Sequence, residues 1–310
     1  MNKLVCAMTL ACVALTPLLL AEAEEEEVWE AEDFLLWWGG KMREELAFAT
    51  WPGKNGALKK GLAFNVADYP ALNGWVISED KLDLWSLQYG LTREVVLRKP
   101  PASPNDALMM ITVAVAHGST DNAHELLLRL GPLPTPAGPD PYVRGDKGDI
   151  AVGDLNIVHS GFDSSSLVAF ARNNVVCTLR CRQSSSQTPI DLVALAKEID
   201  AKIKALPDLT PAQFDALRPA ITTFAPADPS INQPNGSTTL NITASDPSGE
   251  SLSKVFTKDP GIRLDAKATP PIVETDSART GTFAVKLVLA NQSLLFSTAE
   301  AKITVKIPDQ

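Results

Sequence analysis

The stretch Met109-Met110-Ile111-Thr112-Val113-Ala114-Val115-Ala116 decides the fold of the first two thirds of the chain. It is a continuous apolar run with β-branched members, which is typical of a central strand covered on both faces. Thr120 or Asp121 follows at the right distance to cap a helix. The apolar stripe of that helix consists of Ala123, Leu126, Leu127 and Leu130. The run therefore predicts a strand followed by a helix that packs on the sheet.

Further strands and helices are expected on both sides of this run. Before it, residues 75–77, 84–89 and 94–98 have the character of short strands. After it, three more strands are expected at 150–158, 167–171 and 175–182, the last two joined by an Asn-containing hairpin turn. Thr188 is expected to cap a second long helix and Thr210 a short last one. We expect an antiparallel sheet with helices on one face, an α+β domain over residues 34–219.

The last ninety residues have a different pattern, in which helix signals are absent. Residues 240–244, 283–287 and 303–307 alternate between apolar and polar side chains, as strands with one buried face do. Turn sequences such as Asp246-Pro247-Ser248-Gly249 and Asn291-Gln292-Ser293 separate them. Short alternating strands at this spacing predict an all-β sandwich over residues 220–310.

Residues 221–308 resemble a bacterial immunoglobulin-like domain of the cadherin-like or PKD-like kind. The resemblance rests on a proline-rich lead-in, on residues 240–246 running into Asp-Pro-Ser-Gly, and on the closing strand at 301–308. It implies a spacer or adhesion unit of an exported protein. The segment has neither cysteine nor tryptophan, so it departs from the antibody-type core.

The amino end has the three parts of a secretory signal peptide. Lys3 supplies a positive charge, an apolar run extends over residues 4–20, and Ala21-Glu22-Ala23 places small residues before a cleavage site. The run contains polar residues and a proline and is short for a bilayer span, which favours a cleaved signal over a transmembrane helix. We expect export with cleavage after Ala23, and no integral membrane segment in the mature chain.

Two of the four cysteines leave with the signal peptide. Cys12 follows Leu10-Ala11 as in a lipoprotein site, but the apolar run continues beyond it, which argues against lipidation. Cys177 and Cys181 remain and share one face of a predicted strand. Four residues along a strand span about 13 Å, beyond the ~7 Å limit between the Cα atoms of a disulfide. We therefore expect two buried thiols and no disulfide.

The charge is concentrated at one place. The chain has 28 basic and 37 acidic side chains, a net charge of −9. Residues 24–33 hold seven of the acids and no base, so this acidic leader accounts for most of the imbalance and the remainder of the mature chain is close to neutral. No basic patch is present, so the sequence excludes a nucleic-acid partner.

Six tryptophans lie in the first third of the mature chain. Exposed tryptophans bind partner proteins or stack on sugar faces, because they offer a large contact area at a low entropy cost. Four of them are the candidate ligand-binding residues: Trp37, Trp38, Trp51 and Trp75. The alternative interpretation, that these side chains fill the core of the sheet domain, stays open.

The sequence contains few motifs of catalytic or metal-binding sites. There is no Gly-x-Ser-x-Gly elbow, phosphate-binding loop or zinc helix. Asp246 and Asp259 lie near expected sandwich turns and are candidate ligands for Ca²⁺, while His159 and Asp163 with nearby serines are the basis for a hydrolase alternative. No cofactor is expected.

The sequence favours an exported, non-enzymatic envelope protein. Its α+β domain would bind or support a partner, and its immunoglobulin-like domain would serve as a spacer or adhesion unit. Two alternatives remain: a carbohydrate- or peptidoglycan-binding module that uses the tryptophan-rich region, and a secreted hydrolase whose active site is assembled from separate loops. An envelope protein and a cell-wall polysaccharide are the partner classes considered.

Overall fold

The computed structural model describes eight segments of the chain. They comprise residues 57–100, 108–116, 119–130, 142–144, 150–159, 167–182, 190–276 and 279–307. The signal peptide, the acidic leader and Trp37, Trp38 and Trp51 lie outside these residues.

The first half of the described chain forms a seven-stranded sheet in the order β1-β2-β3-β7-β6-β5-β4, with every neighbouring pair antiparallel. The strands are β1 (Val76–Asp83), β2 (Gly90–Arg98), β3 (Leu108–Ala116), β4 (Tyr142–Arg144), β5 (Leu155–His159), β6 (Leu167–Arg172) and β7 (Val175–Arg182). Two short 3-10 turns, η2 (Val66–Asp68) and η3 (Pro70–Leu72), precede the sheet.

Strand β3 lies inside this sheet, between β2 and β7, and is buried on both faces. Ile111, Val113 and Val115 belong to one hydrophobic cluster, whereas Ala114 and Ala116 belong to another. Because side chains alternate along a strand, the two clusters lie on opposite faces of the sheet. The prediction of a central strand covered on both faces is confirmed.

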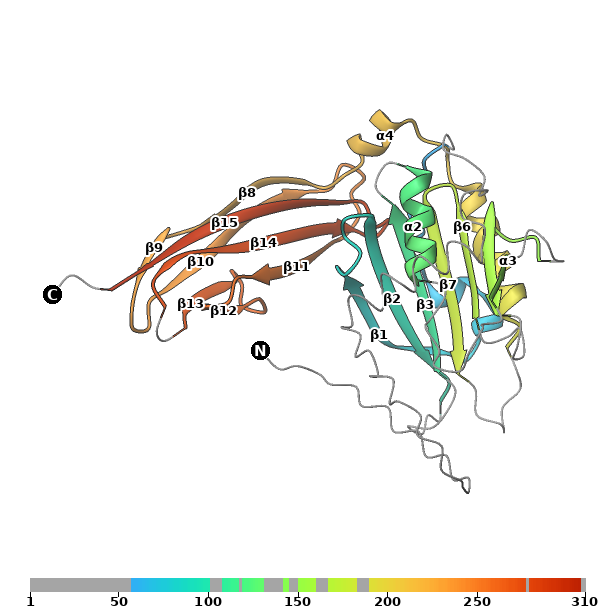
Figure 1. Ribbon diagram of the computed structural model, residues 1–310, viewed down its shortest axis with the longest axis horizontal. Helices are drawn as coiled ribbons and strands as arrows, with labels where there is room; N and C mark the ends of the chain where they lie inside the picture. The colour runs from blue at the N-terminus through green and yellow to red at the C-terminus, as the bar shows by residue number, and fades with distance from the viewer. Residues whose placement is uncertain are drawn as a thin grey trace, which may run out of the picture.

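The two long helices lie on opposite faces of the sheet. They are α2 (Thr120–Leu130) and α3 (Leu192–Ala205). Figure 1 shows α2 in front of the sheet and α3 behind it. Leu127 of α2 packs in the cluster that contains Ala114, and Ile199 of α3 packs in the cluster that contains Val113. The expectation that the helices share one face is therefore wrong. An apolar stripe shows that a helix packs on a sheet, but it carries no information about which face the helix covers.

Two local expectations also differ from the structure. Residues 84–89 form the turn between β1 and β2 instead of a strand, and the turn is stabilised by a hydrogen bond from the Trp85 N–H to the Asp83 carboxylate, 2.9 Å. The cap of α3 is Asp191, whose side chain accepts from the Ala194 N–H, whereas Thr188 lies outside the described residues. Asp is favoured both in turns and at helix N-caps, because its carboxylate accepts hydrogen bonds from nearby backbone N–H groups.

A short helix leads from the sheet to the rest of the chain. Helix α4 (Pro211–Ala216) begins with the predicted cap at Thr210, which forms a capping box with Gln213. Strand β8 begins only four residues after α4 ends. The chain between the sheet and the next unit is therefore short.

The last part of the described chain is a β-sandwich, as predicted. Its strands are β8 (Ala220–Pro226), β9 (Ser230–Asn232), β10 (Ser237–Ser245), β11 (Leu252–Lys258), β12 (Ile262–Asp265), β13 (Ile272–Thr275), β14 (Gly281–Asn291) and β15 (Phe296–Lys306). They form two four-stranded sheets, in the orders β12-β13-β10-β8 and β11-β14-β15-β9. All pairs are antiparallel except β15 with β9. The sandwich has its own hydrophobic cluster, which includes Leu240, Val273 and Ile303.

The arrangement on both faces of the large sheet is testable by truncating one side chain on each face. Leu127→Ala and Ile199→Ala should each lower the free energy of unfolding by about 2–5 kcal/mol, because both side chains are fully buried and leave a cavity. Urea denaturation measures the change. Lys197→Ala, on the exposed side of α3, is the control and should change the value by about 0.5 kcal/mol or less. An unchanged stability for either core variant would show that its face is not packed.

Candidate functional site: the junction of sheet and sandwich

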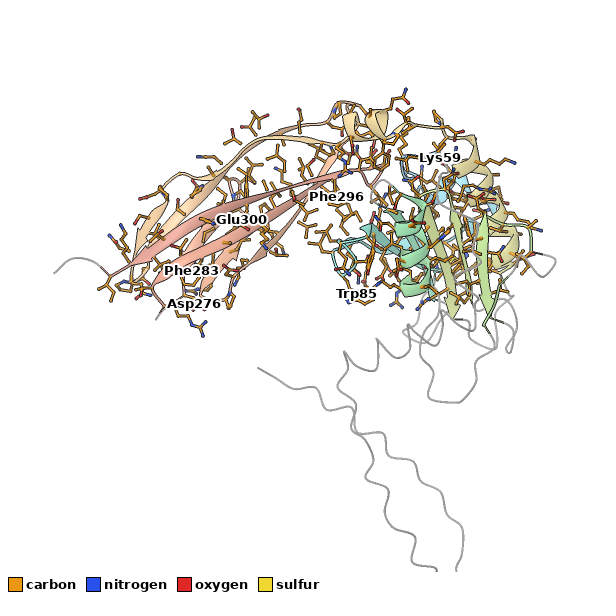
Figure 2. All side chains as sticks on the ribbon, turned by 45° about the horizontal axis from the view of Figure 1, so that its top comes forward. Lys59, Trp85, Asp276, Phe283, Phe296 and Glu300 are labelled. Atoms are coloured by element: carbon orange, nitrogen blue, oxygen red, sulfur yellow. The ribbon has the colours of Figure 1, made fainter. Side chains whose placement is uncertain are left out.

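The sandwich inserts its β14–β15 turn into the core of the large sheet. Leu294, Leu295 and Phe296 are only 1%, 2% and 6% exposed. All three belong to the hydrophobic cluster that also contains Val115 of β3 and Phe214 of α4. Figure 2 shows Phe296 at the end of the sandwich nearest the sheet. One continuous core therefore joins the two units.

A set of hydrogen bonds fixes the conformation of this turn. Asn291 accepts from the Leu295 N–H through its side chain, 3.0 Å, and its backbone N–H donates to the Leu295 carbonyl, 3.0 Å. The Asn291 amide group also donates to Asp246, 2.9 Å. Glu250 accepts from both the N–H and the hydroxyl of Ser293, each at 2.8 Å. These bonds hold the β14–β15 turn, with its apolar residues 294–296, in one conformation.

On the sheet side, the turn contacts a short extended segment, residues 58–61. The Gly61 N–H donates to the Ser293 carbonyl, 2.8 Å. A Cβ on Gly61 would lie 2.4 Å from that carbonyl oxygen and 2.6 Å from Cγ2 of Val115. Real Cβ atoms do not approach other atoms so closely, so this contact requires glycine.

The same segment is held firmly by the rest of the sheet unit. Leu58 and Leu209 exchange two backbone hydrogen bonds, 3.1 and 2.8 Å. The backbone of Lys59 pairs with the buried Asn174 amide, 2.6 and 2.9 Å. Its ammonium group donates to the Leu206 carbonyl, 2.7 Å, and pairs with Asp208, 2.8 Å, which offsets the cost of burying the charge. Gly61 therefore presents a fixed docking point.

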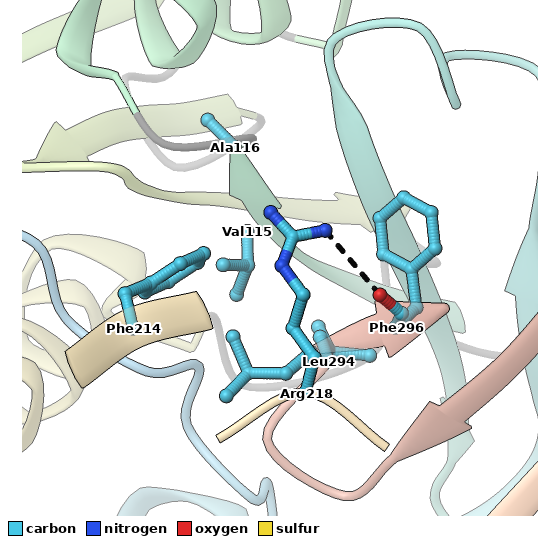
Figure 3. Close-up of a pocket in the computed structure, with 7 residues that line it drawn as sticks. Val115, Ala116, Phe214, Arg218, Leu294 and Phe296 are labelled. Carbon is cyan, nitrogen blue, oxygen red and sulfur yellow. Dashed lines mark hydrogen bonds between the residues drawn. The ribbon is translucent and has the colours of Figure 1, made fainter. Parts of the chain in front are cut away.

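Polar contacts surround the apolar insertion. Lys60 forms an ion pair with Glu250 of the sandwich, 3.1 Å. Arg218, just before β8, pairs with Asp215, 3.0 Å. It also donates to the Phe296 carbonyl, 3.4 Å, the bond that Figure 3 draws. Its guanidinium group also lies 5.6 Å from the centre of the Phe214 ring. These contacts link the connecting chain to both units.

Two hollows border the junction. The smaller is drawn in Figure 3 and is lined by Val115, Ala116, Phe214, Arg218, Leu294, Leu295 and Phe296. The larger is an open groove lined by Leu87, Gln88, Arg218, Phe296, Ser297 and Thr298. Neither lining set contains a carboxylate, a histidine or a cysteine, so the side chains there can bind but supply no general base.

The structure locates two of the six tryptophans. Trp75 is half-buried and packs against the main core, which fits the alternative interpretation for this residue. Trp85, which was not among the candidates, is 55% exposed. The Arg129 guanidinium group lies 5.6 Å from the centre of its ring. Trp37, Trp38 and Trp51 lie outside the described residues, so the candidate set Trp37, Trp38, Trp51 and Trp75 as a whole stays a prediction.

The candidate calcium ligands do not meet. Asp246 bonds the backbone N–H groups of Ser248 and Glu250, each at 2.9 Å, near the junction end of β11. Asp259 lies at the other end of β11 and accepts from the Ala284 N–H, 2.8 Å. In the described part of the chain, no group of three or more His, Cys, Asp or Glu side chains is placed to hold a metal ion. Asp246 stabilises the turn before β11, and Asp259 bonds the backbone of the neighbouring strand β14.

The remaining candidate groups are structural or lie outside the described residues. Cys177 is fully buried among Val175 and Leu179, and burial raises the pKa of its thiol far above the usual range, so the thiol stays protonated. No disulfide joins it to Cys181. Asp163 lies outside the described residues and His159 ends β5.

Comparisons with known proteins give fold-level similarities only. No protein-family model matches the chain, and no curated protein does. Among solved structures, the PKD domain from the KIAA 1837 protein is 22% identical over 27% of this chain and 86% of that one, with a TM-score of 0.22. Tandem Ig repeats of Dlar are 10% identical over 66% of this chain and 91% of that one, with a TM-score of 0.24.

A third similar structure contains extracellular cadherin domains 3–6 of protocadherin gamma B2. It is 11% identical, covers 76% of this chain and 66% of that one, and has a TM-score of 0.22. These structures are of the classes that the sequence of residues 221–308 resembles, but the sandwich assignment itself rests on the strand pairing described above. Within the described residues, no helix has the length and apolar character needed to cross a membrane.

Sequence reasoning missed the junction. Its one visible signal is that three large apolar residues, Leu294-Leu295-Phe296, directly follow the turn sequence Asn291-Gln292-Ser293. An apolar tip on a hairpin has no partner within its own sheet, which indicates docking elsewhere. No comparable signal marks Gly61, because its partner Ser293 is distant in the sequence.

Crowding at Gly61 is testable by adding one methyl group. Gly61→Ala should lower the free energy of unfolding by about 1–3 kcal/mol, because the new Cβ overlaps the Ser293 carbonyl and Val115. Urea denaturation followed by circular dichroism measures the loss. The neighbouring Lys60→Ala removes only a partly exposed ion pair and should cost about 1 kcal/mol or less. If Gly61→Ala were as stable as the wild type, the close docking of the turn would be wrong.

Proposed function

We propose that the chain is an exported, non-enzymatic envelope protein in which an immunoglobulin-like domain holds an α+β domain in a fixed position. The α+β domain covers residues 34–219, the immunoglobulin-like domain covers residues 220–310, and residues 1–23 form the signal peptide. In this proposal the sandwich acts as a spacer or adhesion unit and the sheet domain binds or supports a partner. The mature protein is secreted or periplasmic.

The burial of Leu294, Leu295 and Phe296 in the core of the sheet carries this proposal. Domains that serve as independent modules meet through small polar contacts and move relative to one another. An apolar turn inserted into a neighbour's core instead fixes the orientation of the two units. Such a junction suits a protein that presents one surface at a constant distance and angle from another.

The chemistry at the junction supports binding over catalysis. The two hollows are lined by apolar, amide, hydroxyl and guanidinium side chains. Catalysis of ester, peptide or glycoside cleavage generally uses a carboxylate, imidazole or thiolate near the substrate. The lining residues here contribute none of these groups. They do provide hydrogen-bonding groups beside an apolar floor, which is the composition of a binding surface.

The proposal is tested by producing the full-length chain in a bacterial host and separating the cell fractions. We expect the protein in the periplasm or medium, with Glu24 as its first residue after cleavage behind Ala23. The purified mature protein should show no turnover of generic ester, peptide or glycoside substrates. An uncleaved chain in the cytoplasm would contradict the export proposal. A turnover that a point mutation removes would contradict the non-enzymatic one.

A further inference from the structure

One end of the large sheet gathers arginine side chains from two strands on a single face. Arg98 of β2 and Arg182 of β7 both pair with Leu108 of β3, so they lie in one row of the sheet, about 10 Å apart. Arg180 lies in the next row, opposite Met110. Because side chains alternate along a strand, all three arginines lie on the face that α2 covers. Arg98 is distant from the other two in the sequence, so no basic run marks this cluster.

The arginine cluster, Arg98, Arg180 and Arg182, lies at the end of the sheet opposite the junction with the sandwich. Helix α2 has 11 residues and is about 16 Å long, whereas the nine residues of β3 span about 30 Å. The last residue of α2, Leu130, accepts a hydrogen bond from the Arg180 guanidinium group, 2.5 Å. The row of Arg98 and Arg182 is therefore beyond the end of the helix. In Figure 1 it is at the lower ends of β2 and β7, whereas the sandwich joins the upper end of the sheet.

Two of these guanidinium groups have no acidic partner in the described part of the chain. Arg98 and Arg182 are partly exposed, and neither forms a hydrogen bond or an ion pair with a described residue. By contrast, Arg93 and Arg172 of the same sheet each pair with an aspartate. Lys99 directly follows Arg98 and is exposed, which adds a further positive charge. Like charges that lie close together repel one another, so an anionic partner would stabilise this cluster.

The chain itself contains a segment of complementary charge. The acidic leader, residues 24–33, has seven acidic side chains and no basic one. Residues 34–56, 23 in number, connect it to the described chain and span at most roughly 80 Å when extended. This reach exceeds the length of the sheet strands, so the leader is able to meet either end of the sheet. A segment of the same chain also binds at a higher effective concentration than a free ligand, which favours contacts that are individually weak.

We propose that the acidic leader docks on the arginine cluster and pairs with it through carboxylate–guanidinium contacts. A guanidinium group binds a carboxylate through two parallel hydrogen bonds and is weakly hydrated, so arginines suit this role better than lysines do. The contact neutralises the cluster and holds the mature amino end at the end of the sheet that is remote from the sandwich. Any other polyanion must displace the leader to reach these arginines. The leader thus acts as an intramolecular cover of a basic surface.

This inference is independent of the scaffold role proposed above. None of the residues in the cluster contacts the sandwich or lines a hollow at the junction. A flexible junction would therefore leave the docking of the leader intact, and a free leader would leave the junction intact.

Zero-length cross-linking of the mature protein, residues 24–310, tests the contact. A carbodiimide joins a carboxylate to a lysine amine with loss of water, and the exposed Lys99 supplies the amine beside Arg98. Mass spectrometry of the digested product should find Lys99 linked to a glutamate of the leader. The yield should fall about fivefold or more in Arg98→Gln/Arg182→Gln. It should fall similarly for the wild type in 1 M salt, where the Debye length is only about 3 Å.

A matched variant controls for the loss of charge. Lys197→Gln/Lys204→Gln removes two positive charges from the exposed side of α3, on the opposite face of the sheet, and should leave the Lys99 link unchanged. The thermal unfolding midpoint of Arg98→Gln/Arg182→Gln should match that of the wild type, because both side chains are partly exposed. The comparison between low and high salt uses the unaltered protein, so it tests the contact even where the variant folds poorly.

Three results would overturn the proposal. The first is the absence of a link between Lys99 and the leader at low salt. The second is an equal yield of leader links at Lys99, Lys197 and Lys204, which would show contact without preference for the cluster. The third is a link that joins two chains, seen as a product of twice the mass, which would show that the leader does not dock within its own chain.

Discussion

The insertion of Leu294, Leu295 and Phe296 into the core of the seven-stranded sheet is the contact on which the rest of the arrangement depends. Full burial of a Leu or Phe side chain contributes roughly 1.5–3 kcal/mol. Three such side chains therefore favour the docked state strongly over a freely hinged one. Beside this insertion, the units are joined by the short chain between α4 and β8, the Gly61–Ser293 hydrogen bond and the partly exposed Lys60–Glu250 ion pair.

The polar contacts around the inserted turn determine how it is oriented on the sheet, more than they contribute to the free energy of docking. The hydrogen bond from Gly61 to Ser293 and the pair of bonds from Ser293 to Glu250 allow one register of the turn against residues 58–61. On the sheet side, residues 58–61 are fixed as well, because the backbone and the ammonium group of the buried Lys59 both have partners. The open groove that residues of the β1–β2 turn and of β15 line depends on this register.

Local patterns in the sequence predicted local structure well. The apolar run at 109–116 correctly indicated a strand buried on both faces, and Thr210 correctly indicated a capped helix. Alternating strands at the carboxyl end correctly indicated a sandwich. These features succeed because each is decided by residues close together in the chain, through periodicity or through a side chain bonding its own backbone.

Features decided by distant residues were not predictable in the same way. The stripes of α2 and α3 gave no information about which face each helix covers, although the run at 109–116 already required cover on both. Trp75 packs on the core, whereas Trp85 is exposed. Gly61 meets Ser293 only in the folded chain. The tryptophan pattern in the sequence could therefore not tell which of these side chains is exposed.

The central claim, that sheet and sandwich form one rigid body, is tested most directly by a distance measurement between them. Spin labels are attached at two exposed positions, Lys197→Cys on α3 and Lys302→Cys on β15, in a Cys181→Ser background. Pulsed electron–electron double resonance then measures the distribution of distances between the two labels. We predict a single narrow distance distribution that broadens when Leu295→Asp disrupts the insertion. A broad distribution in the protein with Leu295 intact would contradict the account.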